Sequence, residues 1–287
     1  MTASSPGDDQ PSPTPLADLP PALPVAARLE LDQRRDVAVF LDYDGTLTPI
    51  VDDPDDALLD EATRGSIVRL AATTLVAIVS GRDLDDVRSK VGIDGLAYAG
   101  SHGFDILHPD GTRRQLATAH VEVLDRAEEE LHRDLGEIPG VRIERKGFAI
   151  AVHDRQVDDP ALRDRIGEVV TGLGERYDEL RATGGKRIHE LRPAIDWDKG
   201  RAIETLLTEL DAEDHLPVYL GDDLTDEDGF RAVRARGGIA VVVRGEDDDR
   251  DSLAQAALET TDDARRFLDD LQGLVANRPE TTETGNE

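Results

Sequence analysis

The sequence contains no cysteine, which excludes disulfide bonds and thiol chemistry. No apolar run approaches the roughly 20 residues that cross a bilayer. The segment 1–24 is rich in Pro, Ser and Asp and has neither the basic start nor the apolar core of a signal peptide. Lysine is scarce, because only 4 of the 33 basic residues are lysine. Because the sequence shows neither a signal peptide nor a long apolar run, we expect a cytoplasmic protein without a membrane span.

Positive charge is also scarce, and the formal net charge is −29 at pH 7. Such a surface repels nucleic acid and anionic membranes, so neither is an expected partner. At molar salt the screening length falls to roughly 3 Å and most of the self-repulsion disappears. The charge therefore favours a halophilic, salt-adapted cytoplasm. The alternative is an acidic protein of ordinary salt requirement.

The 287 residues are enough for one large or two ordinary domains. Strand and helix patterns alternate over residues 28–108 and again over 191–275, which is typical of a doubly wound parallel sheet, an α/β core of Rossmann-like architecture. Residues 109–190 lack this strict alternation and predict a smaller inserted α+β cap domain. Residues 1–27 and 276–287 are polar or proline-rich, and we expect disordered tails there.

The apolar run at 37–41 predicts a buried strand that ends directly before Asp42 and Asp44. In open α/β sheets, ligands bind beyond the carboxyl ends of the strands. Two neighbouring carboxylates there favour a divalent cation or an acid/base pair. The alternative is that an aspartate only caps the following helix.

Three further loops of the core carry complementary polar groups. Ser80, Gly81 and Arg82 follow the second strand, and Lys199 starts a helix. A later strand exit carries three more acidic residues, at Asp222, Asp223 and Asp226. Acidic residues on two strand ends can bracket one Mg²⁺. A hydroxyl, a lysine and backbone amides suit a phosphate. The sequence therefore predicts a site for phosphoryl chemistry.

The four segments also match, in order, the four motifs of the haloacid dehalogenase superfamily of phosphotransferases. They are Asp42-Tyr43-Asp44-Gly45-Thr46, Ser80, Lys199, and Gly221-Asp222-Asp223-Leu224-Thr225-Asp226. Within that superfamily the chain resembles the trehalose-6-phosphate phosphatases over about residues 36–272. The narrower marks are Ser80-Gly81-Arg82, Gly100-Ser101-His102-Gly103, Glu144-Arg145-Lys146-Gly147 and Glu190-Leu191-Arg192-Pro193. One departure is Asp198, where this family is expected to have asparagine.

The resemblance implies a role for each residue of the core site. Asp42 would be the nucleophile that becomes an aspartyl-phosphate, and Asp44 the general acid and base. Ser80, Gly81, Arg82 and Lys199 would hold the phosphoryl group. Mg²⁺ would be held by Asp42, the Asp44 carbonyl and Asp222, with Asp223 or Asp226 orienting its water ligands. Arg82 could instead cap the helix that follows it.

The resemblance also implies that the cap selects the sugar. Glu144, Lys146 and Glu190 would bind hydroxyls of the distal glucose, and His102 would line the cleft between the domains. On chemistry alone, Glu144 and Lys146 fit a solvated turn, and Glu190 fits a hinge salt bridge. His102 fits a structural hydrogen-bonding role equally well.

The expected activity is Mg²⁺-dependent hydrolysis of trehalose 6-phosphate, in functional coupling with a trehalose-6-phosphate synthase. A close alternative is a phosphatase of glucosyl- or mannosyl-3-phosphoglycerate or of sucrose phosphate. A phosphosugar mutase and an inactive regulatory subunit that binds sugar phosphate are more distant alternatives. The retention of Asp42, Asp44, Lys199 and Asp222 argues against the inactive subunit.

The charge pattern leads to a testable prediction about salt. The melting temperature of the purified protein is expected to rise from dilute buffer to molar KCl, because salt screens the repulsion between acidic residues. Thermal unfolding across a KCl series measures this. Maximal stability in low salt would contradict salt adaptation.

Overall fold

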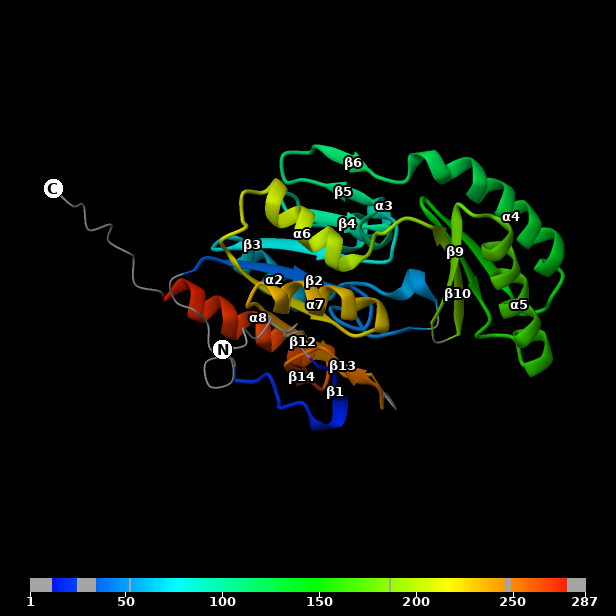
Figure 1. Ribbon diagram of the computed structural model, residues 1–287. Helices are drawn as coiled ribbons and strands as arrows, with labels where there is room; N and C mark the ends of the chain where they lie inside the picture. Colours follow the sequence, from blue (N-terminus) through cyan, green and yellow to red (C-terminus); the bar gives the residue numbers. More distant parts are fainter. Residues whose placement is uncertain (1–11, 25–34, 52, 186, 246–248, 278–287) are drawn as a thin grey trace, which may run out of the picture.

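The larger of the two main sheets has eight strands in the order β14-β12-β11-β2-β3-β4-β5-β6 (Figure 1). The computed structural model describes residues 12–24, 35–51, 53–185, 187–245 and 249–277. From β14 to β4 neighbouring strands run parallel, whereas β5 and β6 are antiparallel additions at one edge. The predicted α/β class with a parallel core is therefore confirmed.

The strands of this sheet lie at β2 (Val37–Leu41), β3 (Leu75–Val79), β4 (Ala97–Gly100), β5 (Asp105–Leu107), β6 (Arg113–Gln115), β11 (Leu216–Gly221), β12 (Ile239–Val243) and β14 (Ala256–Leu258). The α-helices around it are α2 (Glu61–Ala71), α3 (Leu84–Val91), α6 (Lys199–Glu209), α7 (Glu227–Ala235) and α8 (Thr261–Ala276). Short 3₁₀ turns occur at η2 (Pro54–Asp56), η3 (Ser101–Gly103) and η5 (Leu224–Asp226).

Helices cover both faces of the larger sheet. Every residue of β2 is buried, as expected for a strand that has helices on both sides. Alternate β2 residues belong to two apolar clusters, since side chains of a strand point to opposite faces. Val39 shares one cluster with α2, α3 and α8, and Phe40 shares the other with α6 and α7. The core thus consists of two layers that clamp β2 in place.

A second, antiparallel sheet has the order β7-β8-β10-β9. Its strands are β7 (Arg142–Lys146), β8 (Ala149–His153), β9 (Leu180–Gly185) and β10 (Ile188–Pro193), with helices α4 (Val121–Leu135) and α5 (Pro160–Arg176) and the turn η4 (Thr118–His120). The helices pack on one face of this sheet through an apolar cluster that includes Leu124, Ile150 and Leu191. We call this part of the chain the small unit, residues 118–193. In Figure 1 it lies at one end of the larger sheet (green).

The chain passes from the larger sheet to the smaller one, and back, a few residues after the domain boundaries expected at 108/109 and 190/191. The hairpin β5–β6 pairs with β4 and extends the larger sheet to Gln115. At the other end β10 continues to Pro193 in the smaller sheet. The β9 strand had no clear signal in the sequence, because Leu180-Arg181-Ala182-Thr183-Gly184-Gly185 has few of the residues that favour strands.

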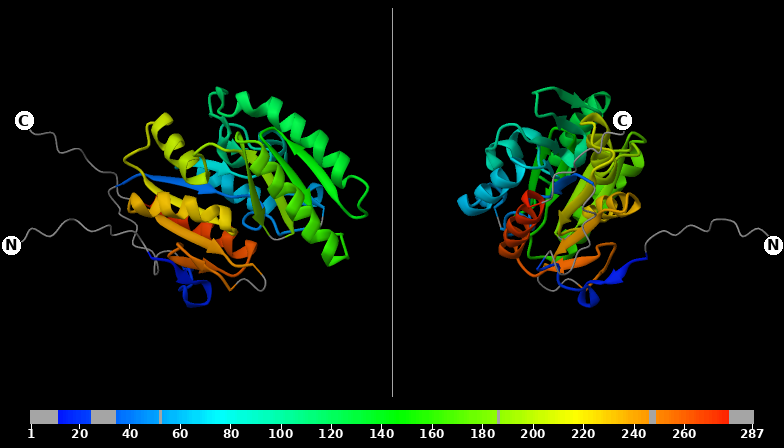
Figure 2. Two further views of the ribbon diagram at one scale, coloured as in Figure 1. Left: turned by 45° about the vertical axis from the view of Figure 1, so that its right-hand side comes forward. Right: turned by 90° about the vertical axis from the view of Figure 1, so that its left-hand side faces the viewer.

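The expectation of a disordered tail at 1–27 is wrong for part of that range. Thr14 and Pro15 form β1, which pairs with β13 (Asp251–Ser252), and η1 (Leu16–Asp18) follows. The side chains of Leu16, Leu19 and Ala22 are buried. Both views of Figure 2 show this segment (blue) beside the strands near the C-terminus (orange). The three apolar residues anchor a proline-rich stretch that has no periodicity. Residues 1–11, 25–34 and 278–287 lie outside the described ranges.

Among the residues described, no helix combines the length and the apolar character that a membrane span needs.

The N-terminal anchor can be tested by truncating one side chain. Leu16→Ala should lower the free energy of unfolding by about 2–3 kcal/mol, because it leaves a cavity at a side chain that is only 1% exposed. Urea unfolding measures this difference, with Leu58→Ala as the control because Leu58 is 68% exposed. Equal unfolding midpoints for the two variants would show that the segment contributes nothing to stability.

Candidate functional site

Three neighbouring strands, β11, β2 and β3, end at the same edge of the larger sheet and carry the predicted polar residues. Asp42 follows β2, and its backbone N–H donates to Leu220 O of β11 at 2.9 Å. Ser80 follows β3, which pairs with β2 on the other side. Asp222 follows β11. The chain leaves β2 toward β3 and later returns on the opposite side at β11, so this is the point where the strand order reverses.

Lys199 joins two of these loops through a buried pair of salt bridges. Its Nζ lies 2.7 Å from Asp42 Oδ1 and 2.6 Å from Asp226 Oδ1, and all three residues are buried. The two carboxylates raise the pKa of Lys199 against the effect of burial, so the amine stays charged. Asp198 caps the helix α6 by accepting from Arg201 N at 2.8 Å. The departure from asparagine at 198 therefore preserves the cap that positions Lys199.

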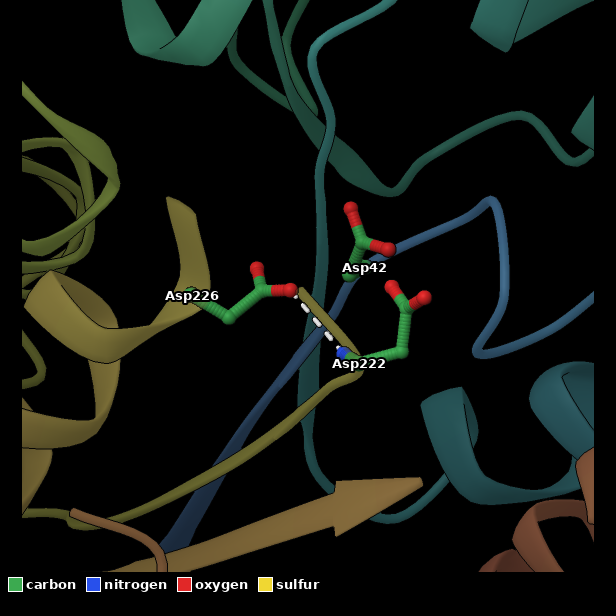
Figure 3. Close-up of side chains that lie close together, drawn as sticks. All are labelled: Asp42, Asp222 and Asp226. Atoms are coloured by element: carbon green, nitrogen blue, oxygen red, sulfur yellow. Dashed lines mark hydrogen bonds between the residues drawn. The ribbon is translucent and has the colours of Figure 1, made fainter. Parts of the chain in front are cut away.

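Asp226 uses both carboxylate oxygens within the protein. Oδ1 accepts from Lys199 and from the Tyr219 hydroxyl, and Oδ2 accepts from the backbone N–H groups of Asp222 and Asp223 at 2.9 Å each. Figure 3 shows the bond to Asp222 N and the turn of the loop around the carboxylate. Burial would raise the pKa of Asp226, but Lys199 and these hydrogen bonds lower it. Asp226 thus holds the loop after β11 and Lys199 in one arrangement.

Asp42, Asp222 and Asp226 can each offer one oxygen within 4.8 Å of the others (Figure 3). Burial raises the pKa of Asp42 to about 7, with Lys199 opposing and Asp226 adding to the rise. Burial and the neighbouring carboxylates also raise the pKa of Asp222. A Cβ at Gly45, where φ is +76°, would lie 2.0 Å from Asp222 Oδ2, so glycine is needed beside this carboxylate. Three close carboxylates around one lysine suit a divalent cation with oxygen ligands.

Asp44 and Asp223 stand apart from this group. Both Asp44 oxygens accept hydrogen bonds from Arg82, at 2.7 Å from Nε and 2.7 Å from Nη2. Arg82 also donates to Asp86 and to Pro54 O, each at 2.8 Å. In this structure Arg82 thus binds Asp44, and its contact with the phosphoryl group stays a prediction. The exposed Asp223 side chain caps the turn η5.

Ser80 and Gly81, which follow β3, lie against His102 in the turn η3. We call these three residues the wall of the phosphate site. The Ser80 Oγ accepts from Arg82 N at 3.1 Å, and Ser80 O accepts from His102 N at 2.9 Å. A Cβ at Gly81 would come within 2.7 Å of the His102 ring, so glycine allows this close approach. Burial, with Arg192 nearby, lowers the pKa of His102 to about 3, so the imidazole is neutral.

The small unit brings the predicted sugar residues close to this wall. Glu190 Oε1 lies 3.1 Å from Lys146 Nζ, and Oε2 accepts from Arg192 Nε at 2.9 Å and lies 3.5 Å from His102 Nε2. Burial opposes the ionisation of Glu190, but Lys146 and its other partners lower its pKa well below the ordinary value. Glu144 is 2.9 Å from His153 Nε2 on the same sheet. Glu190 is thus one of the residues through which the two units contact each other.

Three residues that hold this site together were not among the predicted site residues. Tyr219 lies inside an apolar strand, where nothing in the sequence distinguishes it from a core residue. Arg192 is two residues from Glu190 on one strand, and this period-2 spacing was a usable signal. Asp83 accepts from Gly147 N at 2.7 Å and from Ser101 Oγ at 3.0 Å, and such a contact between two units has no local signature.

Comparisons with known proteins show the family of this chain. The family model described as trehalose-phosphatase matches residues 40–262. The chain is 46% identical over 254 residues to a trehalose-phosphate phosphatase of Mycobacterium marinum, covering 85% of this chain and 64% of that protein. It is 43% identical over 275 residues to the trehalose-phosphate phosphatase of Mycobacterium tuberculosis, and this match covers 92% of this chain and 68% of that protein. The chain thus spans about two thirds of the length of these relatives.

Among solved structures, the C-terminal domain of the Candida albicans trehalose-6-phosphate phosphatase superposes with a TM-score of 0.75 at 25% identity, over 89% of this chain and 99% of that one. A trehalose-6-phosphate phosphatase of Aspergillus fumigatus superposes with a TM-score of 0.62 at 28% identity, over 89% of this chain and 99% of that one. The family model covers most of the chain and includes all the strand-end motifs described above. The chain belongs to the trehalose-phosphatase family.

Proposed function

We propose that this protein is a phosphatase that hydrolyses trehalose 6-phosphate to trehalose and phosphate with Mg²⁺ as cofactor. The observation that carries the proposal is the buried Asp42–Lys199–Asp226 arrangement at the strand ends, with Glu190 and Lys146 of the small unit close by. The family membership and the activity for which the relatives are named support the same substrate.

The metal would be held by Asp42 and Asp222, together with the backbone carbonyl of Asp44. The donor set fits, because the three grouped carboxylates carry more negative charge than Lys199 can balance. Asp226 already accepts four hydrogen bonds, so we assign it a positioning role beside the metal, and Asp223 remains a candidate to orient a water ligand. When bound, Mg²⁺ would neutralise charge on the phosphoryl oxygens.

The residues of the chain then divide the reaction into two displacements. A carboxylate oxygen of Asp42 attacks phosphorus, the bond from phosphorus to the sugar oxygen breaks, and Asp44 gives that oxygen its proton. Water next attacks the aspartyl-phosphate while Asp44 takes its proton, and phosphate leaves with Asp42 restored. Lys199, Ser80 and the Gly81 amide would hold the phosphoryl oxygens during both steps. Both Asp44 oxygens accept from Arg82 in this structure, so protonation of Asp44 would weaken at least one of these two bonds.

The small unit would act as the cap that selects the substrate. Glu144, Lys146 and Glu190 share one sheet and would bind hydroxyls of the distal glucose, since carboxylates accept two such bonds each. His102, neutral and next to Glu190, would line the cleft between the units. A cytoplasmic location, salt adaptation and a coupling to a trehalose-6-phosphate synthase that supplies the substrate complete the proposal.

The substrate assignment is tested by phosphate release from a panel. Trehalose 6-phosphate should be hydrolysed faster than sucrose phosphate or glucosyl-3-phosphoglycerate, because two glucose rings would match the acidic and basic groups of the small unit. The panel is run with Mg²⁺ and after chelation with EDTA, at low and molar KCl. Preference for a phosphoglycerate sugar would overturn the substrate, and full activity in EDTA would overturn the metal.

The nucleophile is tested by Asp42→Asn. Phosphate release should fall below detection, because an amide cannot form the acyl phosphate, while the far-ultraviolet circular dichroism stays unchanged. Asp94→Asn is the matched control, since the Asp94 side chain is 96% exposed and precedes the amino end of β4, at the opposite edge of the sheet from Asp42. Turnover by Asp42→Asn at the wild-type rate would refute the assignment.

A further inference from the structure

The sheet of the small unit has one face that its own helices do not cover. Ile143, Ile150, Ala182 and Leu191 contact the apolar cluster with α4 and α5. Because strand side chains alternate, their neighbours point to the other face. In Figure 1, β9 and β10 lie between those helices and the larger unit, so this second face is turned toward the larger unit.

Strand register arranges the residues of this second face in rows. One row runs from Glu144 through Ala151 and Glu190 to Thr183, one residue from each strand. The next row runs from Lys146 through Ala149 to Arg192 and Arg181, since Arg192 and Arg181 are paired. Both rows thus have a small alanine in the centre and polar groups on either side. Three of these polar residues, Glu144, Lys146 and Glu190, are the ones proposed above to bind the sugar.

Thr183 differs from its neighbours because its hydroxyl has no partner. The Oγ1 atom is buried and makes no hydrogen bond with any residue that the structure describes. A buried hydroxyl without a partner costs about 1–3 kcal/mol, so such a group calls for a ligand or a water. Its cross-strand partner is Glu190, and the Cβ atoms of such a pair lie about 4.5–5.5 Å apart.

Other unpartnered polar atoms lie around the same place. They are Arg181 Nε and Trp197 Nε1, both buried without a hydrogen bond in the described part of the chain. Arg181 is two residues from Thr183 on one strand and donates through Nη2 to Trp197 O at 2.9 Å. Trp197 in turn lies against Gly103, next to His102. Unsatisfied donors therefore occur on Arg181, in the strand of Thr183, and on Trp197, which lies beside the turn that carries His102.

We propose that the Thr183 hydroxyl is a further substrate-binding group, which hydrogen-bonds a hydroxyl of the distal hexose of a disaccharide phosphate. This inference rests on the proposed function. A sugar hydroxyl both donates and accepts, as does a threonine hydroxyl, so the contact completes the row that Glu144 and Glu190 begin. An anion is a poorer occupant of this row, because its two carboxylates would repel it.

The test uses Thr183→Val, which keeps the shape of the side chain and removes the hydroxyl. The KM for trehalose 6-phosphate should rise about tenfold, equivalent to one lost hydrogen bond of about 1.4 kcal/mol, while kcat changes by less than about twofold. Hydrolysis of p-nitrophenyl phosphate, which has no sugar, should stay at the wild-type rate. Thr183→Ser keeps a hydroxyl and should restore most of the KM.

Controls separate a binding role from a structural one. The melting temperature of Thr183→Val should equal or exceed that of the wild type, because an unpartnered buried hydroxyl has been removed. Thr171→Val on the exposed side of α5 is the matched control and should leave every readout unchanged. An unchanged KM for Thr183→Val would overturn the inference and show that only water occupies the place. If the wild type itself fails to prefer trehalose 6-phosphate, the proposed function fails instead.

Discussion

The structure of the site depends on one buried ammonium group. Lys199, the first residue of α6, lies between Asp42 and Asp226. Asp42 directly follows β2, and Asp226 lies in the loop after β11. Bringing three charges out of water is costly, and a buried ion pair is a weak source of stability. Its value here is positional, since each carboxylate has a fixed direction relative to the others. Removing the lysine would leave two buried carboxylates facing one another.

Asp226 extends this constraint to the backbone. Its second oxygen accepts from the amides of Asp222 and Asp223, so the same residue that fixes Lys199 also fixes the loop that presents Asp222. Asp42 is held in the same region by the hydrogen bond from its backbone N–H to Leu220 O of β11. The nucleophile candidate and both flanking acids are therefore oriented by one connected set of hydrogen bonds. Residues held in this way need little rearrangement when charge develops on a substrate, which is the usual basis of electrostatic catalysis.

The sequence allowed prediction of whatever depends on strand ends. Asp42, Ser80 and Asp222 each follow an apolar run, and parallel strands bring such positions to one edge. The sequence did not allow prediction of which side chains bind one another. Arg82, for example, has the chemistry to contact a phosphate, a helix end or Asp44. The N-terminal anchor was missed because three apolar residues among prolines have no period. Thr183 was missed because its position depends on pairing with a strand that itself has weak strand propensity.

In the proposed function, chemistry and substrate selection lie on different sheets, so the relative placement of the two sheets needs its own contacts. Near the site those contacts include polar ones, in which Asp83 accepts from Gly147 N and Glu190 lies beside His102. They also include an apolar contact between the rings of Phe104 and Phe148. Ser101 and His102 hold positive φ values of 49° and 57°, which non-glycine residues adopt at a cost of about 1 kcal/mol or more. The strained turn places His102 against Gly81 on one side and Glu190 on the other. Together with the packing of Phe104 on Phe148, this turn fixes how the sheet of the small unit meets the loop after β3.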